Sequence, residues 1–146
     1  MARHFTWEQA SRLLPEVGRL LREAVEASSL HHESEAALST LQTRIQTMGG
    51  VTVDRASVHQ LRESRNAAAQ KMSHSLESIA ELGVQVKDLH TGLVDFPSLY
   101  RGREVLLCWR LGEPGIEYWH GLEDGYRGRK RIDTAFREQL RGNEEQ

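Results

Sequence analysis

The segment that decides the fold runs from Glu81 to Ile132 and reads ELGVQVKDLHTGLVDFPSLYRGREVLLCWRLGEPGIEYWHGLEDGYRGRKRI. It holds most of the aromatic residues of the chain, two of its three prolines and its single cysteine. Short apolar runs alternate in it with turn-forming residues, which is typical of antiparallel strands. The residues before it carry a helical pattern of apolar side chains. We therefore predict an α+β fold, in which a long helical part is followed by a small sheet.

Four strands are predicted in this segment, joined as an antiparallel β-meander. They span 84–88, 93–97, 104–110 and 116–120, and glycines lie in the turns between them. Alternation along the strands then assigns the side chains to two faces. The predicted core face carries Val84, Val86, Val94, Phe96, Leu106, Cys108, Ile116, Tyr118 and His120. The opposite face carries Gln85, Lys87, Leu93, Asp95, Val105, Leu107, Trp109, Glu117 and Trp119. A slip of one residue in the register would exchange the two sets.

A first helix is predicted to begin near Thr6, because Thr6 and Gln9 have the spacing of a capping box. Proline lacks the backbone N–H that a helix interior needs. Pro15 therefore predicts a kink or a helix boundary at Leu14 and Pro15.

Two longer patterns have the alternating four-three spacing of a coiled coil. They span residues 13–48 and 58–82, and two glycines follow the first of them. Thr52 or Asp54 is predicted to cap the second helix, and Gly83 to end it. The short connection makes the two helices antiparallel neighbours, so we expect a long helical hairpin.

The chain has 146 residues, which is about the length of one domain. We predict a single domain made of a helical hairpin (1–83), an antiparallel sheet (84–132) and a C-terminal tail (133–146). Phe136 and Leu140 have the spacing of a short amphipathic helix in that tail.

Composition excludes several classes of protein. The formal net charge is −2, so no overall positive field attracts nucleic acid or an acidic membrane. The single cysteine, Cys108, excludes a disulfide within the chain. No apolar stretch approaches the roughly 18 residues that span a bilayer, and the N-terminus has no apolar export signal. A cytoplasmic protein is expected.

Six segments resemble one known family in the same order along the chain. They read FTWEQASRLLPEV, ELGVQVKDL, GLVDFP, VLLCWRLGE, YWH and DGYRGR. Together they are similar to the uncharacterised prokaryotic domain of unknown function family 2203, over nearly the whole chain. The resemblance implies a small bacterial protein with a helical front and this C-terminal block. It implies no established activity, cofactor or catalytic residue.

Acidic and imidazole side chains around the meander are candidate ligands for a divalent metal, the one cofactor that we consider. The candidates are Asp88, Asp95, Glu113 and His120. Such a site needs three or more carboxylate or imidazole ligands that converge on the ion. The predicted register argues against it, because it places Asp95 and His120 on opposite faces. The alternative is that these acids accept hydrogen bonds in turns.

Two other groups have a weaker chemical pattern. His32 with Glu35, and His74 with Glu77, have the i, i+3 spacing of bundle metal sites but in reversed order. Cys108 is a candidate nucleophile, with His120 on the same predicted face as its base. A free cysteine in the middle of a strand is more often a small core residue.

The basic run after the meander is a candidate anion-binding loop. It contains Arg127, Arg129, Lys130 and Arg131 among glycines, and arginine binds phosphate bidentately. The alternative is a surface loop whose charges pair with nearby acids. No nucleic-acid motif accompanies the run, so nucleic acid is not the expected partner.

The second sheet face carries more apolar surface than a small monomer usually exposes, and Leu107, Trp109 and Trp119 are predicted as interface residues. The C-terminal tail, a second subunit or a ligand are the alternatives for its cover. We expect a homodimer, with a protein partner or small ligand left open. A non-enzymatic binding or scaffold module is the leading hypothesis. A metal-assisted enzyme at the acidic and histidine residues is the alternative, and anion binding by the basic loop is another.

Overall fold

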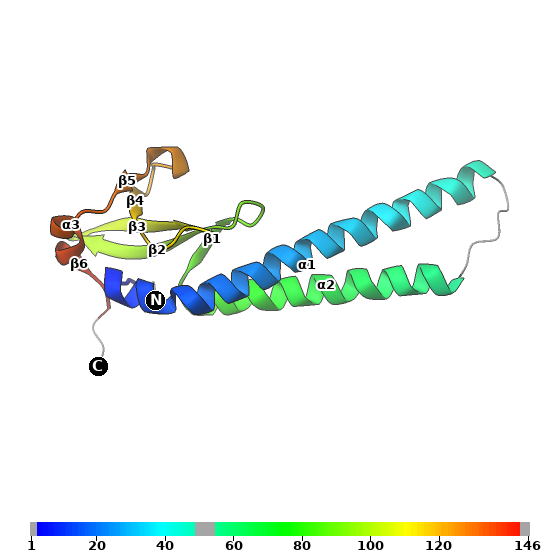
Figure 1. The fold of residues 1–146 in the computed structure, drawn as a ribbon, viewed down its shortest axis with the longest axis horizontal. Coiled ribbons are helices and arrows are strands. Elements are labelled where there is room, and N and C mark those ends of the chain that lie inside the picture. The colour runs from blue at the N-terminus through cyan, green and yellow to red at the C-terminus, as the bar shows by residue number, and fades with distance from the viewer. Residues whose placement is uncertain (1–2, 49–54, 144–146) are drawn as a thin grey trace. The chain divides into compact units, whose positions relative to one another are not determined.

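The computed structural model describes residues 3–48 and 55–143. The chain forms two compact units (Figure 1). One consists of Met1–Arg22 and Leu76–Gln146, and the other of Glu23–Ser75. The first unit contains the sheet, and the second contains the central and distal parts of two long helices. In the described part of the chain, no helix combines the length and the apolar character that a membrane span requires.

The two long helices that the sequence predicts are present as an antiparallel hairpin, α1 (Trp7–Met48) and α2 (Arg55–Glu81). The capping box is confirmed, since the Thr6 N–H donates to Gln9 Oε1 at 2.9 Å and the Gln9 N–H donates to Thr6 Oγ1 at 3.1 Å. Gly83 follows the end of α2 with a φ of 91°, which favours glycine. The predicted caps at Thr52 and Asp54 lie outside the described residues.

The boundary predicted at Leu14 and Pro15 is wrong, because α1 continues through Pro15. Proline removes one backbone hydrogen bond from the helix interior. Ala10 before it and Val17 after it are both fully buried in the same core. Packing on both sides of the proline therefore holds the helix together where the local signal favours a break.

The sheet confirms the predicted meander and adds two short strands. The elements after α2 are β1 (Gln85–Asp88), β2 (Leu93–Tyr100), β3 (Arg103–Arg110), β4 (Tyr118–Gly121), the 3-10 turn η1 (Tyr126–Gly128), β5 (Lys130–Arg131), the predicted short helix α3 (Thr134–Gln139) and β6 (Leu140–Arg141). Neighbouring strands follow the order β1-β2-β3-β4-β5, and β6 pairs with β2. Strands of two residues, such as β5 and β6, are too short for alternation to predict them.

The register between β2 and β3 differs from the predicted one by one residue. Arg101 and Gly102 form the connecting loop with φ values of 51° and 78°, and Tyr100 pairs directly with Arg103. Two residues with positive φ are typical of a tight hairpin turn of type I′. As a result Val94 pairs with Trp109, and its side chain lies on the face opposite to that of Cys108. The predicted division of the faces is therefore wrong for this pair of strands.

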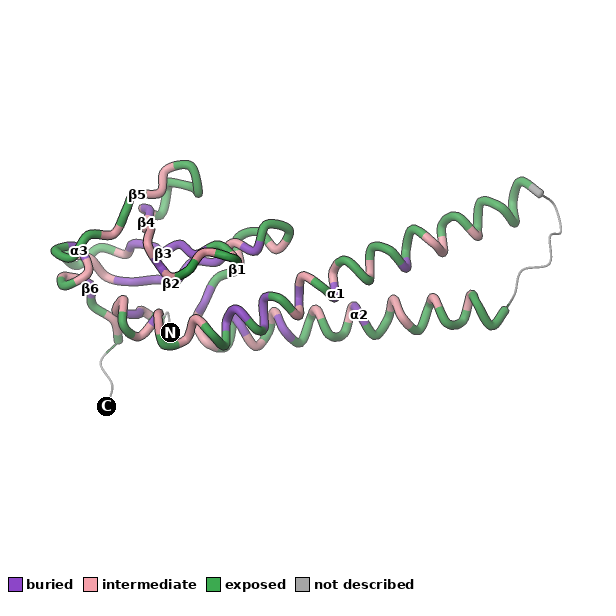
Figure 2. The backbone as a smooth tube through the Cα atoms, viewed as in Figure 1, coloured by how far each residue is buried: buried purple, intermediate pink, exposed green. Residues whose placement is uncertain are grey.

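The core of the first unit lies between the sheet and the helices. Trp109 and the fully buried Leu107 pack with Val17 and Leu21 of α1 and with Ile79 of α2. Figure 2 shows this burial along β2, β3 and the first part of α1. Two of the three predicted interface residues, Leu107 and Trp109, thus lie inside the chain's own core and expose almost no area to a partner.

The third, Trp119, is half-buried under the C-terminal segment. Its ring stacks on Phe136 of α3 with a centroid distance of 4.3 Å and an interplanar angle of 16°. Tyr100 lies against the same Phe136 ring at 4.5 Å. The C-terminal tail therefore covers part of this sheet face, which is one of the alternatives considered from the sequence.

Candidate functional site

Three buried polar side chains meet on the sheet face that points away from the core. Asp95 lies on β2, Cys108 on β3 and His120 on β4, and their exposed fractions are 0%, 0% and 4%. Asp95 pairs directly with Cys108 across the strands, while His120 pairs with Leu106, two residues from Cys108. One ligand atom of each residue lies within 4.8 Å of the other two. The observed register thus gathers three metal-binding residue types at one point.

The hydrogen bonds of His120 define where its protons lie. Its Nδ1 is 2.9 Å from the carbonyl oxygen of Gly121, which can only accept, so Nδ1 carries a hydrogen. Its Nε2 is 3.0 Å from Asp95 Oδ1. A hydrogen bond between these two atoms needs one proton shared by the pair. Among the described residues, the carboxyl group of Asp95 is the hydrogen-bond partner of Nε2.

The burial of Asp95 at this position costs folding free energy. Burial raises the pKa of its carboxyl group, and the charge and hydrogen bond of His120 oppose that increase. Its second oxygen, Oδ2, is buried and has no full hydrogen bond in the described part of the protein, although the Cys108 thiol acts on the carboxyl group as a weak donor. A buried unsatisfied polar atom is rare in folded proteins and costs about 1–3 kcal/mol. The burial of Asp95 Oδ2 without a full hydrogen bond therefore requires a physical explanation.

The thiol of Cys108 is unsuited to act as a nucleophile. Burial raises its pKa to about 12, the negative charge of Asp95 adds to this, and Arg129 partly opposes it. The thiol is therefore neutral at physiological pH, whereas the thiolate is the reactive form. Both ring nitrogens of His120 are already occupied by Gly121 and Asp95. The geometry does not favour the Cys108–His120 nucleophile considered from the sequence.

Only two of the four predicted metal ligands take part in this cluster. Asp88 is exposed at the end of β1, where its Oδ1 accepts a hydrogen bond from the His90 N–H at 2.9 Å. Glu113 accepts from the Arg110 N–H at 2.7 Å and pairs with Arg129. Both side chains thus accept hydrogen bonds from backbone N–H groups near turns, which is the alternative to metal binding considered from the sequence. Among the described residues, Asp95, Cys108 and His120 are the group with metal-binding geometry.

The residues of the predicted anion-binding loop do not converge on one site. Arg129 binds both oxygens of Glu113 at 3.0 and 3.1 Å, and its guanidinium lies 4.1 Å from the ring centroids of both Tyr118 and Tyr126. The remaining predicted residues lie elsewhere: Lys130 over the Trp119 ring at 5.0 Å, Arg131 3.7 Å from Glu117, and Arg127 exposed. Arg129 therefore acts as a structural link between η1, β4 and the turn after β3.

The paired helical residues considered from the sequence are also at the surface. His32, His74 and Glu77 are exposed, and Glu35 binds Arg65 at 3.0 Å. Their arrangement offers no converging ligand set.

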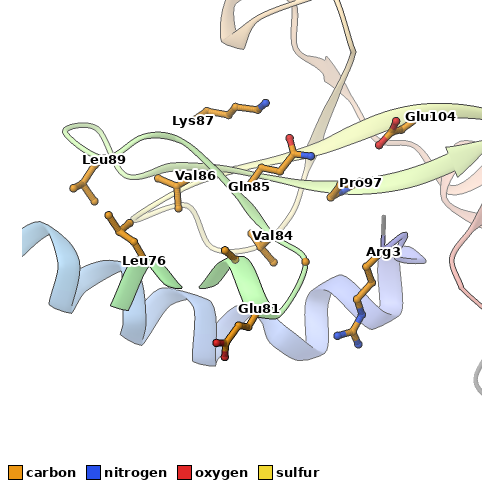
Figure 3. Close-up of a pocket in the computed structure, with 12 residues that line it drawn as sticks. Arg3, Leu76, Glu81, Val84, Gln85, Val86, Lys87, Leu89, Pro97 and Glu104 are labelled. Carbon is orange, nitrogen blue, oxygen red and sulfur yellow. The ribbon is translucent and has the colours of Figure 1, made fainter. Parts of the chain in front are cut away.

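A separate open groove of about 880 Å³ lies beside the edge strand β1 and the end of α2 (Figure 3). Its wall carries charges of both signs, from Arg3, Lys87, Glu81 and Glu104. Glu104 lies 3.6 Å from His4, and Arg3 donates to the carbonyl oxygen of Leu82 at 3.3 Å. Its described lining includes no Ser, Thr, Cys or His and no buried polar residue, so the groove has less chemical definition than the buried cluster.

Comparison with known proteins supports the resemblance noted in the sequence. The model of the family described as "Uncharacterized conserved protein (DUF2203)" matches residues 3–132. No curated protein and no solved structure matches the chain. The match covers most of the sequence, including all of α1, α2 and the meander with the buried cluster. The chain belongs to the DUF2203 family.

Proposed function

We propose that this protein is a non-enzymatic metal-binding module that holds a divalent transition metal ion, of the Zn²⁺ class, at Asp95, Cys108 and His120. The observation that supports the proposal is the convergence of a carboxyl oxygen, a sulfur and an imidazole nitrogen, all buried, within 4.8 Å of one another. These are the three ligand types that Zn²⁺ prefers in proteins.

The spacing of the ligand atoms is compatible with such an ion. Tetrahedral Zn²⁺ with bonds of about 2.0–2.3 Å keeps its ligand atoms roughly 3.3–3.7 Å apart. His120 Nε2 and Asp95 Oδ1 are now 3.0 Å apart, so a metal between them requires an opening of a few tenths of an ångström. Asp95 Oδ2, which has no full hydrogen bond in the described structure, offers a further oxygen at the same place. Coordination of the metal would then compensate for the burial of this oxygen.

The hydrogen bond of His120 to the backbone supports the same reading. Metal-binding histidines usually donate their second ring N–H to a carbonyl or carboxylate, which fixes the tautomer and the ring orientation. The Nδ1–H of His120 donates to the Gly121 carbonyl in this way, and Nε2 faces the cluster.

Charge also favours a divalent ion over any other cation. Metal binding displaces protons from its ligands. Loss of one proton from the Asp95–His120 pair and one from Cys108 leaves two negative charges, which a divalent ion neutralises. A buried site that ends neutral avoids the large cost of burying net charge. Arg129, a cation that acts on Cys108, already has its charge paired with Glu113.

The burial of all three ligands argues for holding a metal and against catalysis on a substrate. A catalytic zinc site keeps an open coordination position that substrate can reach. Here the three side chains are at most 4% exposed. We also propose a cytoplasmic location, because a reducing compartment keeps the Cys108 thiol available.

The proposal is tested on untagged full-length protein with Co²⁺ as a spectroscopic probe and with elemental analysis. We expect one ion per chain and the ultraviolet charge-transfer band of a cobalt–thiolate bond. Cys108→Ser should abolish the band, and His120→Asn should abolish stoichiometric binding. Asp88→Asn is the matched control, because Asp88 is an exposed carboxylate outside the cluster. Absence of stoichiometric metal, or binding that survives both variants, would overturn the proposal.

A further inference from the structure

The second compact unit buries its small side chains and leaves its large apolar ones partly exposed. The buried residues are Ala24, Ala27, Ser34, Ala68 and Ser75. The large apolar side chains of the distal part are only half-buried or exposed: Leu38, Leu41, Ile45, Val58 and Leu61. Figure 2 shows the loss of burial toward the C-terminal end of α1 and the N-terminal end of α2. The described residues of the chain cover these large side chains only in part.

The partly exposed side chains line a groove between the two helices. It measures about 460 Å³, and its walls include Leu38, Leu41, Ile45 and Val58 with Arg62 and Arg65. The four apolar residues belong to the patterns with four-three spacing that extend along both helices. In a coiled coil, such positions pack against another helix. The groove therefore presents the unfilled half of a helical bundle.

We propose that a second copy of this chain fills the groove, so that the distal parts of two hairpins overlap in antiparallel orientation as a four-helix bundle. Two helices with an apolar groove between them complete such a bundle when an identical pair packs on them. A two-fold axis makes the surface self-complementary, so that one groove serves both copies.

Charge along the hairpin supports this occupant and this orientation. Segments 38–48 and 55–62 contain Arg44, Arg55 and Arg62 and no acidic residue. The part of α1 from 23 to 37 contains four glutamates and neither lysine nor arginine. Antiparallel overlap brings the basic end of one copy beside the acidic stretch of the other, whereas parallel overlap places like charges together. Arg62 lines the groove and has no ion-pair partner among the described residues.

The first test measures the mass of the full chain by light scattering during size-exclusion chromatography. We expect twice the chain mass of 16.6 kDa for the native sequence at tens of micromolar. Ile45→Gln should return the mass to that of one chain. Leu122→Gln is the matched control, since Leu122 is 59% exposed and Ile45 is 43% exposed, and Leu122 lies in the turn after β4, outside the hairpin, whereas Ile45 lines the groove. Circular dichroism confirms that both variants keep their helices.

The second test addresses the charges. Arg62→Glu should weaken the dimer at least about tenfold, which corresponds to about 1.4 kcal/mol. Arg127→Glu is the control, because it changes the net charge equally at an exposed residue of η1. Higher salt should also weaken the native dimer. Protein freed of metal with a chelator serves throughout, so the outcome is independent of the proposed metal site.

A mass of one chain at about 100 µM would overturn the proposal. So would a dimer that Ile45→Gln and Leu122→Gln affect equally, because the loss would then not depend on the groove. A dimer that responds to Ile45→Gln but not to Arg62→Glu or to salt would overturn the antiparallel orientation.

Discussion

The imidazole of His120 on β4 reaches past strand β3 to the carboxyl group of Asp95 on β2, with 3.0 Å between Nε2 and Oδ1. The bond joins two strands that are not neighbours in the sheet. It places one shared proton in a region where water does not reach either side chain. The stability of the metal-free protein should therefore depend on which group faces Nε2.

Substitutions of Asp95 should show whether its hydrogen bond to His120 Nε2 stabilises the fold or whether the side chain only fills space. Asp95→Asn keeps an N–H that can donate to Nε2. Asp95→Ala leaves Nε2 buried without a partner, which costs about 1–3 kcal/mol more. We expect a smaller loss of unfolding free energy for Asp95→Asn than for Asp95→Ala in urea titrations with chelator present. Equal losses would show that the hydrogen bond contributes nothing measurable.

The helices and the meander were predictable from local signals, whereas the site was not. Spacing along α1 and α2, the capping box of Thr6 and Gln9, and the turn residues each act over a few neighbouring positions. The meeting of Asp95 with His120 depends on the register of β2 against β3, and a shift of one residue separates them. The signal that predicts the correct register is the two-residue loop at Arg101 and Gly102, which pairs the residues directly beside it.

Pro15 illustrates a different limit of local reasoning. A proline favours a helix end by removing a hydrogen bond, and nothing nearby in the sequence reports the compensating contacts. Those contacts come from the sheet, whose Val94, Phe96 and Leu107 belong to the same core as Val17. Tertiary packing thus decides the continuity of α1, and it is visible only once the strands are in place.

Alkaline pH should destabilise the metal-free protein through Cys108. Its pKa rises from an ordinary value of 9.0 to about 12 in the folded state, because burial disfavours the thiolate. Stability from this group is therefore complete below about pH 9 and is lost as the pH rises toward 12. Between pH 8 and pH 10.5 the loss is about 2 kcal/mol, since the full slope of about 1.4 kcal/mol per pH unit applies above the unfolded pKa.

Other groups titrate in the same range, so the comparison is with Cys108→Ala. Urea unfolding at pH 8 and pH 10.5 should show a steeper loss for the native chain than for the variant. Parallel slopes would contradict the raised pKa. Alkylation of Cys108 by iodoacetamide at pH 8 should likewise be slow until urea unfolds the protein.

Gly18 should be replaceable by alanine with a gain in stability. It lies in the interior of α1, where glycine costs about 0.5–1 kcal/mol relative to alanine. A Cβ atom at this position would lie 3.6 Å from Trp109 Cη2, an ordinary contact, and 3.4 Å from the flexible end of Arg22. Gly18→Ala should raise the unfolding free energy by about 0.5 kcal/mol, while Gly18→Leu should lower it by displacing Trp109. Thermal and urea unfolding of the two variants check both signs.

Removal of Phe136 should expose Trp119 and report on the cover that the tail gives to the sheet. The Phe136 ring lies between Trp119 at 4.3 Å and Tyr100 at 4.5 Å, and it is almost fully buried. Phe136→Ala should cost about 3 kcal/mol of unfolding free energy and shift the tryptophan emission to longer wavelength. Trp109 lies in the core beneath α1 and should not contribute to the shift. Trp7 lies under Arg137 of α3, the helix that carries Phe136, so both Trp7 and Trp119 are changed to phenylalanine in the control background. In that background Phe136→Ala should leave the emission maximum unchanged, and a persisting shift would mean that loss of Phe136 disturbs the core around Trp109.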